Sequence, residues 1–361
     1  MEHARIDREK RQFTSTDECV KALGVDVCDA SKRLFKQPRF EQRTDPWYQA
    51  RQLAITASDF AAAANASEWA NPRDIVEKKV NPHKWSEPNV FMLHGIEFED
   101  VAVHEYEKRT GNTVLDFGLL SHVDMFECKP DDKTPEEWHM LIHKAIAANL
   151  TSEEATELTG LTETQWKRIL DVYWLKGSPD GMTTNGILLE IKCPQRLKAG
   201  YVRPQYYAQV QLLMEIMDTD ACHFVQYVPS HSEAHSCEYD MVVIARDRDW
   251  FATHKRKAKE TWDAIMHYRR HKELPPILKG HWLPARWTDD KGVERVRFEL
   301  VGALKRTREP SSSMLRNPST TREQRFLDKC CFLLEDGEES SGYDDDSVSI
   351  GPFDTAPKRS K

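Results

Sequence analysis

The feature that most constrains this sequence is a hairpin signal between two apolar runs. The runs are VYWLKGSPDGM (172–182) and ILLEIKCP (187–194), and Thr-Thr-Asn-Gly separates them. Asn185-Gly186 between apolar runs is the strongest short signal for a β-hairpin. A turn there brings residues five before it and five after it close together, so we expect Asp180 to lie roughly opposite Glu190.

The alternation of a β-strand sorts the side chains of the second run onto two faces. One face is apolar and suits a core, and it carries Ile187, Leu189, Ile191 and Cys193. The other face carries Leu188, Glu190 and Lys192, and we expect its charged groups to point toward a cleft.

Asp180, Glu190 and Lys192 would then meet at one spot. Two carboxylates so close repel each other unless a cation lies between them. Oxygen ligands with open water positions suit Mg²⁺ or Mn²⁺. The lysine can orient or deprotonate an attacking water and stabilise charge on a phosphate. S-P-D-G alone is an ordinary turn and E-x-K alone an ordinary strand, but together they indicate a metal-dependent phosphodiesterase site.

The charge of the chain is unevenly distributed. The 361 residues hold 51 Lys and Arg and 59 Asp and Glu. Eight of the acids lie in residues 330–357, which hold no Lys or Arg, so the remaining 51 acids balance the 51 bases. The acidic total therefore does not exclude a nucleic-acid partner for the body of the chain. Basic clusters at 255–259 and 269–272 fit such a partner, although a solvated helix face is the commoner meaning of a charge run.

Periodicity and capping residues predict the secondary structure. We expect helices from Asp45-Pro46 through about 64, at 71–80, at 89–110, within 135–171, from Pro204 and at 248–271. In the 135–171 segment, Thr151 and Thr162 are the expected caps around Gly160. Strands are expected near 113–120, at 221–228 and at 238–245.

The ends of the chain differ in composition from its middle. Residues 1–43 are polar and predict an arm with one short helix. Residues 281–361 form an extension that we expect to be largely disordered and acidic from about 303. The eight cysteines include no C-x-x-C pair, which indicates free thiols in a reducing, intracellular compartment. PKRSK at 357–361 is a candidate nuclear-import signal, and without it the cytoplasm is expected. No apolar window is long enough to span a membrane.

Five motifs together resemble a known family. SPDG (178–181), LEIKCP (189–194) and YYAQVQ (206–211) resemble the PD-(D/E)XK nuclease superfamily, and more narrowly its phage lambda exonuclease/YqaJ viral recombinase group. WYQARQLAITAS (47–58) and HGIEFED (94–100) resemble two upstream motifs of that group. The resemblance runs from about 45 to 244. It implies an α/β fold with a restriction-endonuclease-like core at 44–280, in which helices flank a mixed central β-sheet and 135–171 is a helical insertion.

The resemblance also implies metal ligands. Asp180, Glu190 and the main-chain carbonyl of Ile191 would bind Mg²⁺, for which Mn²⁺ can substitute. Glu99 on the preceding helix would help to hold a second ion, and the neighbouring Glu97 is the competing choice. An exposed helix glutamate is the alternative meaning of either residue.

Further roles follow from the same motifs. Lys192 would handle the attacking water, and Gln209 would organise Lys192 and nearby water. Gln211 is the weaker choice because a two-residue step turns it about 200° around the helix. Arg51 and Ser58 would contact DNA phosphate. The structural alternatives are a helix cap for Ser58 and, for Arg51, an ion pair with a carboxylate at the start of its own helix.

The activity implied is 5′→3′ digestion of duplex DNA ends, which leaves 3′ single strands for recombination. A single-strand annealing protein and a homo-oligomeric ring are the partners that the family suggests. A structure-specific or single-strand endonuclease is the first alternative, and a catalytically inert DNA-binding protein is the second. LTSEEATELTGLTETQWKRIL (150–170) also resembles a helix-turn-helix that could bind DNA. The alternative is a small helical cap with its own core of Leu158, Leu161, Trp166 and Ile169.

Overall fold

The computed structural model describes residues 11–40, 44–81, 89–148, 150–230, 236–275 and 282–300. These residues belong to one compact unit, Met1–Leu304. The expected disorder from about 303, the acidic run and the PKRSK segment all lie outside the described residues. No helix in the described ranges is long and apolar enough to cross a membrane.

A five-stranded mixed sheet forms the centre of the fold. Its strands are β2 (Val114–Leu115), β5 (Gly181–Thr183), β6 (Leu188–Lys192), β7 (Ala221–Val228) and β8 (Glu238–Ala245), and they lie in that order. β6 pairs with β7 in parallel, and the other neighbours pair antiparallel. The expected strands at 221–228 and 238–245 are confirmed.

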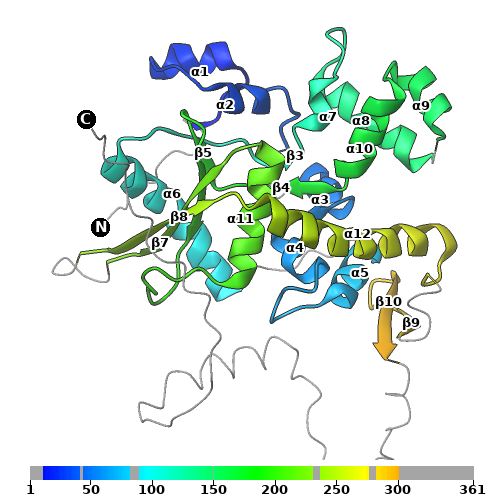
Figure 1. The fold of residues 1–361 in the computed structure, drawn as a ribbon. Coiled ribbons are helices and arrows are strands. Elements are labelled where there is room, and N and C mark those ends of the chain that lie inside the picture. The colour runs from blue at the N-terminus through cyan, green and yellow to red at the C-terminus, as the bar shows by residue number, and fades with distance from the viewer. Residues whose placement is uncertain are drawn as a thin grey trace, which may run out of the picture. The chain divides into compact units, whose positions relative to one another are not determined.

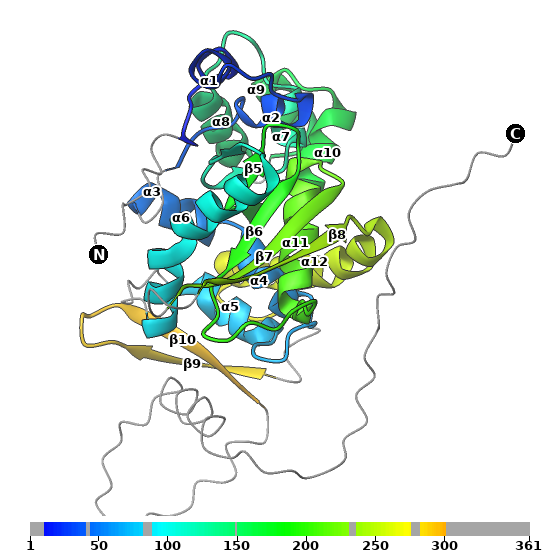
Figure 2. The same ribbon diagram turned by 90° about the vertical axis from the view of Figure 1, so that its left-hand side faces the viewer.

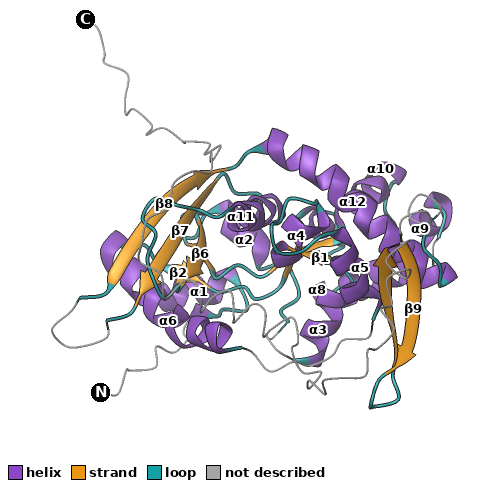
Figure 3. Cartoon of the chain, turned by 90° about the horizontal axis from the view of Figure 1, so that it is seen from below, coloured by secondary structure: helices purple, strands orange, loops and turns teal. Residues whose placement is uncertain are grey.

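Helices cover both faces of this sheet (Figures 1 and 3). α6 (Val90–Thr110) packs Ala102, Val103 and Tyr106 on one face, and Gly111 ends it as expected. α4 (Ala57–Ala63), α11 (Pro204–Met217) and α12 (Arg248–His271) cover the other face. The predicted α/β fold, with a mixed sheet flanked by helices, is therefore confirmed.

The run 45–64 is not one helix. It forms α3 (Asp45–Gln52), strand β1 (Ile55–Thr56) and then α4. β1 pairs in parallel with β4 (Leu175–Gly177), and β3 (Leu120–Ser121) pairs antiparallel with β4, so these strands make a second, three-stranded sheet. The single strand expected near 113–120 is accordingly divided between two sheets, as β2 and β3. Both differences arise from pairing with distant residues, which local periodicity does not report.

Two further segments contain more structure than expected. Residues 11–40 contain two helices, α1 (Thr16–Leu23) and α2 (Asp29–Leu34), and Cys19, Val27 and Leu34 are buried. Strands β9 (Trp282–Thr288) and β10 (Glu294–Leu300) form an antiparallel hairpin. This hairpin contacts α5 (Pro72–Val80), because the Phe298 amide donates a 2.6 Å hydrogen bond to Glu77.

The helical insert has a core of its own. It comprises α8 (Pro135–Ala147), α9 (Ser152–Thr159) and α10 (Glu163–Val172), and α7 (Asp124–Glu127) precedes it. Thr151 and Thr162 cap α9 and α10 as expected, each within a capping box. Leu161, Trp166 and Ile169 are buried in this core, whereas Leu158 is 43% exposed. The core matches the helical-cap alternative, except at Leu158.

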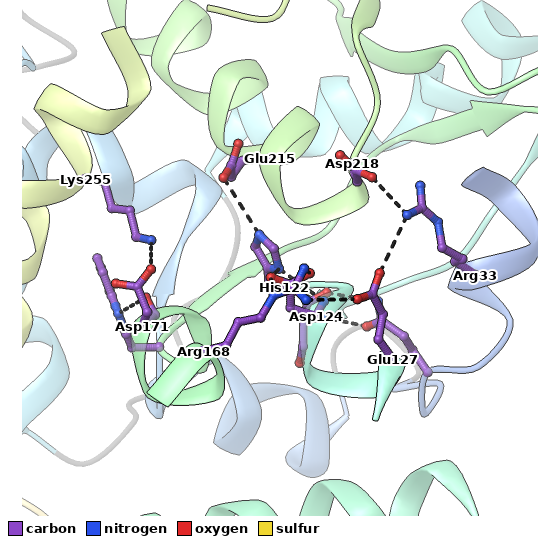
Figure 4. Close-up of polar contacts among 12 residues, drawn as sticks. Arg33, His122, Asp124, Glu127, Arg168, Asp171, Glu215, Asp218 and Lys255 are labelled. Atoms are coloured by element: carbon purple, nitrogen blue, oxygen red, sulfur yellow. Dashed lines mark hydrogen bonds and ion pairs between the residues drawn. The ribbon is translucent and has the colours of Figure 1, made fainter. Parts of the chain in front are cut away.

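Ion pairs attach the insert to neighbouring elements (Figure 4). The side chain of Arg33 in α2 bridges Asp218, just after α11, and Glu127 of α7. Lys255 of α12 lies 2.5 Å from Asp171 of α10. The pair of Lys255 and Asp171 therefore joins the insert to α12, and the pairs of Arg33 join α7, which precedes the insert, to α2 and the end of α11.

Candidate active site

The hairpin of β5 and β6 has the register that the sequence predicted. Met182 pairs with Leu188 and Gly181 with Leu189, so the same register continues to Asp180 opposite Glu190. Gly186 closes the turn with φ +92°, a backbone conformation that favours glycine. The Asp180 carboxylate also accepts a 2.7 Å hydrogen bond from the Ile191 amide. The two predicted carboxylates therefore lie together, Glu190 on β6 and Asp180 directly before β5.

Asp180 lies where the chain passes from one sheet to the other. Residues 178–180 connect β4 of the three-stranded sheet to β5 of the central sheet. A Cβ atom on Gly181 would meet Val114 Cγ1 at 2.3 Å, and one on Gly177 would meet Leu213 Cδ2 at 2.5 Å. Glycines on both sides of this connection therefore allow the close packing that holds Asp180 in place.

Glu190 is buried rather than open to a cleft, which corrects the sequence-based expectation. Its exposure is 0%, because β6 is an inner strand with helices on both faces. One oxygen, Oε1, accepts hydrogen bonds from Lys192 Nζ and, at 2.6 Å, from Gln209 Nε2. The other, Oε2, has no hydrogen-bond partner among the described residues. A buried polar atom of this kind costs free energy and calls for an explanation.

Electrostatics at the site follow from this burial. Burial, together with the charge of Asp180, raises the pKa of Glu190 to about 8. Burial opposes the charge of Lys192, but Glu190 and Asp180 outweigh it and raise the pKa of the ammonium above its usual value. Without a further cation, the site therefore holds a proton on Glu190 more tightly than a solvated glutamate would.

Helix α11 supplies the residues that contact this pair. Gln209, which was expected to organise Lys192, donates instead to Glu190, the partner of Lys192, whereas Gln211 donates to the Ala245 carbonyl and accepts from the Asp247 amide. The preference for Gln209 over Gln211 therefore agrees with the geometry. Tyr206 also belongs to the site, since its ring centroid lies 5.2 Å from Lys192 Nζ, although its role was not predicted from the sequence. Its position one turn before Gln209 was the signal that could have found it.

Glu99 lies on α6, on the other side of β6. Its charge raises the pKa of Glu190 and, after burial and Asp180, that of the Cys193 thiol, so it lies within electrostatic reach of the site. Its side chain is half-buried and that of Glu97 is exposed, which favours Glu99. Among the described residues, however, no three His, Cys, Asp or Glu side chains form a group that could hold a metal ion. The role of Glu99 as a ligand stays a prediction.

Arg51 and Ser58 lie together at the junction of α3 and α4. Arg51 Nη2 donates to Ser58 Oγ at 3.3 Å, and the guanidinium carbon lies 4.4 Å from the centroid of the Trp47 ring. Thr56, not Ser58, occupies the N-cap of α4, so the helix-cap alternative for Ser58 is wrong. Burial lowers the pKa of Arg51, and the nearby Asp59 partly offsets this. An ion pair between Arg51 and Asp45 does not occur in the described part of the chain.

The chain is similar to several known proteins, among them a viral protein and two exonucleases of known structure. A protein of Acanthamoeba polyphaga mimivirus with no assigned function is 24% identical over 255 residues, which are 60% of this chain and 38% of that protein. The match thus spans well under two thirds of the relative's length. An alkaline exonuclease from Laribacter hongkongensis is 21% identical, with 63% of this chain and 96% of that chain covered and a TM-score of 0.44. A phage-related exonuclease from Haemophilus somnus is 11% identical, with 69% and 97% covered and a TM-score of 0.36.

The family comparison covers the segment that holds the site. The model of the YqaJ-like viral recombinase domain matches residues 46–221. That range contains most of α3, all of α4, the β5–β6 hairpin and α11, and so includes the candidate site residues Arg51, Ser58, Glu99, Asp180, Glu190, Lys192 and Gln209. Residues 46–221, just under half of the chain, are therefore similar to the family of YqaJ-like viral recombinase domains.

Proposed function

We propose that this chain is a Mg²⁺-dependent exonuclease that digests one strand of duplex DNA in the 5′→3′ direction. The similarity to the YqaJ-like family supports a DNA nuclease, and the site supports hydrolysis of a phosphodiester bond. The remaining 3′ single strand would be the substrate of a single-strand annealing protein. A ring-shaped homo-oligomer, which would keep the enzyme on its DNA, belongs to the same proposal.

The observation that carries the proposal is the unpartnered Oε2 of Glu190. A carboxylate oxygen that is fully buried without a partner beside a second carboxylate destabilises the folded chain. The same two carboxylates are suitable ligands for a divalent cation. Asp180, Glu190 and the Ile191 carbonyl offer the oxygen donors that Mg²⁺ and Mn²⁺ prefer. Two carboxylates leave positions for water and phosphate, as a catalytic magnesium site requires.

When bound there, Mg²⁺ would supply positive charge for the phosphate and lower the pKa of a water molecule. A second ion would need Glu99. The protein's own groups complete the site. Lys192 carries a proton and, between Glu190 and the ring of Tyr206, is held as a donor that can orient a water or a phosphate oxygen. Gln209 fixes the carboxylate of Glu190, and through it the position of Lys192.

The experiment that tests this proposal compares linear and circular DNA. End-labelled linear duplex should be degraded in Mg²⁺ and left intact in EDTA, while covalently closed circular duplex should resist. Asp180→Asn should abolish digestion and keep DNA binding, since it removes one metal ligand. Cleavage of the circular substrate at a comparable rate would show that the protein is an endonuclease and not an exonuclease. DNA binding without any metal-dependent cleavage would point to an inert DNA-binding protein.

Arg51 tests the direction of digestion. An exonuclease that starts at 5′ ends gains from a group that captures the terminal phosphate, and an arginine can donate two hydrogen bonds to one phosphate. Arg51→Ala should slow digestion of 5′-phosphorylated duplex about ten- to a hundred-fold, the value of one charged hydrogen bond, and slow 5′-hydroxyl duplex only slightly. Equal losses on both substrates, with a lower melting temperature, would make Arg51 a structural residue.

A further inference from the structure

A buried carboxylate lies directly behind Arg51 and Ser58. Asp59, in the first turn of α4, is 4% exposed and accepts a 2.8 Å hydrogen bond from Thr56 Oγ1. The Thr56 hydroxyl also lies 3.2 Å from Ser58 Oγ, which accepts from Arg51. A continuous chain of hydrogen bonds therefore joins the Arg51 guanidinium to the Asp59 carboxylate.

Two adjacent lysines at the end of α5 meet this carboxylate, and their surroundings differ. Lys79 Nζ lies 2.9 Å from Asp59 Oδ2 and donates at 2.7 Å to the Arg51 carbonyl, and its side chain is 2% exposed. Lys79 therefore ties α3, α4 and α5 together. Lys78 Nζ lies 2.6 Å from Asp59 Oδ1, but its side chain is 54% exposed.

The charges in this cluster do not balance. Asp59 is one carboxylate, and Lys79, Lys78 and Arg51 all act on it and hold its pKa well below the usual range, even though burial alone would raise it. Lys79 alone satisfies the need of a buried carboxylate for a paired cation. Lys78 is therefore a surplus cation at the surface, beside the residues of the proposed phosphate site.

We propose that Lys78 is a third DNA-phosphate residue, which exchanges Asp59 for a phosphate oxygen when DNA binds, while Asp59 and Lys79 position Arg51 and Ser58. The inference rests on the proposed function, because it concerns the same DNA-binding surface. A lysine suits an exchangeable contact, since its ammonium is a point charge on a flexible stem with no fixed geometry to satisfy. An exposed ion pair is weak enough to be exchanged at little cost.

The salt dependence of DNA binding tests this role. Binding of a 5′-phosphorylated duplex is measured from 50 to 200 mM salt, in EDTA and on an Asp180→Asn background so that no cleavage occurs. Lys78→Gln should reduce the slope of log K against log salt by about 0.9, the value for one phosphate contact, and raise Kd about ten-fold at 50 mM. Lys78→Arg should restore both values. The matched control is Lys32→Gln, since Lys32 in α2 is 41% exposed and pairs with Asp29; it should leave the slope unchanged.

The outcomes separate this inference from the function on which it rests. If the parent protein does not bind duplex DNA, the proposed function fails. If the parent binds and Lys78→Gln has the same slope as Lys32→Gln, the role of Lys78 is refuted and the proposed function stands. A lower melting temperature with an unchanged slope would likewise make Lys78 a structural partner of Asp59.

Discussion

The buried pair of Asp59 and Lys79 makes the sharpest prediction about stability. Asp59→Asn removes the carboxylate and leaves Lys79, with 2% of its side chain exposed, as an uncompensated buried charge. Breaking such a pair from one side costs about 3–5 kcal/mol. For a domain of this size, that corresponds to a fall in melting temperature of about 2–4 °C per kcal/mol.

The reverse change is expected to cost less. Lys79→Met removes the buried ammonium and its hydrogen bond to the Arg51 carbonyl, but Asp59 keeps Lys78 as a partner. We expect about 1–3 kcal/mol, the range for a lost hydrogen bond with a buried acceptor left behind. The double variant has no unpaired buried charge, so it should be less destabilised than the sum of the two single variants by about 2 kcal/mol.

Urea unfolding of all four proteins measures this coupling energy directly. The pH adds a second test. Burial lowers the pKa of Lys79 to about 8 even though Asp59 opposes the shift, and without Asp59 the pKa must fall further. A lysine that loses its proton on folding contributes stability that rises with pH from its folded-state pKa up to about 10.5. This rise begins at a lower pH in the variant than in the parent, so the cost of Asp59→Asn should shrink as the pH increases toward 8 and level off above it. Additive single effects, or a cost that is constant with pH, would refute the assignment of a buried ion pair.

Three further predictions concern other parts of the fold. Lys192→Ala should abolish cleavage but keep Mn²⁺ binding in calorimetric titration, whereas Glu190→Gln should abolish both cleavage and Mn²⁺ binding. If both variants lose Mn²⁺ binding, Glu190 does not act as a metal ligand separately from Lys192. Burial and then the charge of Lys176 lower the pKa of His143 to about 3, so only the unfolded chain takes up this proton below pH 6.5. Stability should therefore fall by about 1.4 kcal/mol per pH unit below 6.5, and His143→Leu should reduce that slope in urea unfolding at pH 5–6.5. Gly181→Ala should cost about 1–3 kcal/mol by overpacking against Val114, and Val114→Ala should recover part of this if the 2.3 Å contact is the cause.

The hairpin could be predicted in detail because its determinants are local. Asn185-Gly186 fixes the turn, and the alternation of a strand then fixes which side chains face each other. The juxtaposition of Asp180 and Glu190 followed from these two rules. The long helices followed from a different local signal, their capping residues, as in α6 with its end at Gly111. The order of the motifs added Gln209, which was expected beside Lys192 and contacts Glu190 instead.

The burial of Glu190 could not be predicted in the same way. The alternation of the strand places Glu190 on the same face as Leu188, and a strand face that carries charged residues is usually exposed to solvent. Here α4 and α11 cover that face, and their position depends on contacts between elements far apart in the sequence. The pair of Asp59 and Lys79 is a similar case, since the two residues come from different helices that meet only in the folded chain.

The splitting of 45–64 has the same physical origin. Its alanine-rich sequence favours a helix throughout, yet Ile55 and Thr56 are extended because they pair with Leu175 and Lys176. This short strand has a consequence for function. It turns the chain between α3 and α4, so that Arg51 near the end of one helix faces Ser58 at the start of the other.

The two buried carboxylates of this chain, Asp59 and Glu190, differ in how completely they are paired. Asp59 is buried with more cations than it needs, and its hydrogen bonds are complete, so its cluster holds three helices in fixed positions. Glu190 is buried beside a like charge with one oxygen unpaired, so its site is less stable as it stands than a hydrophobic replacement would be. A buried carboxylate oxygen without a partner calls for an explanation, and the proposed cation supplies one. In the proposed function, the cluster at Asp59 would hold Arg51 and Ser58 against the DNA, and the site at Glu190 would gain its missing contacts from a cation and a phosphate.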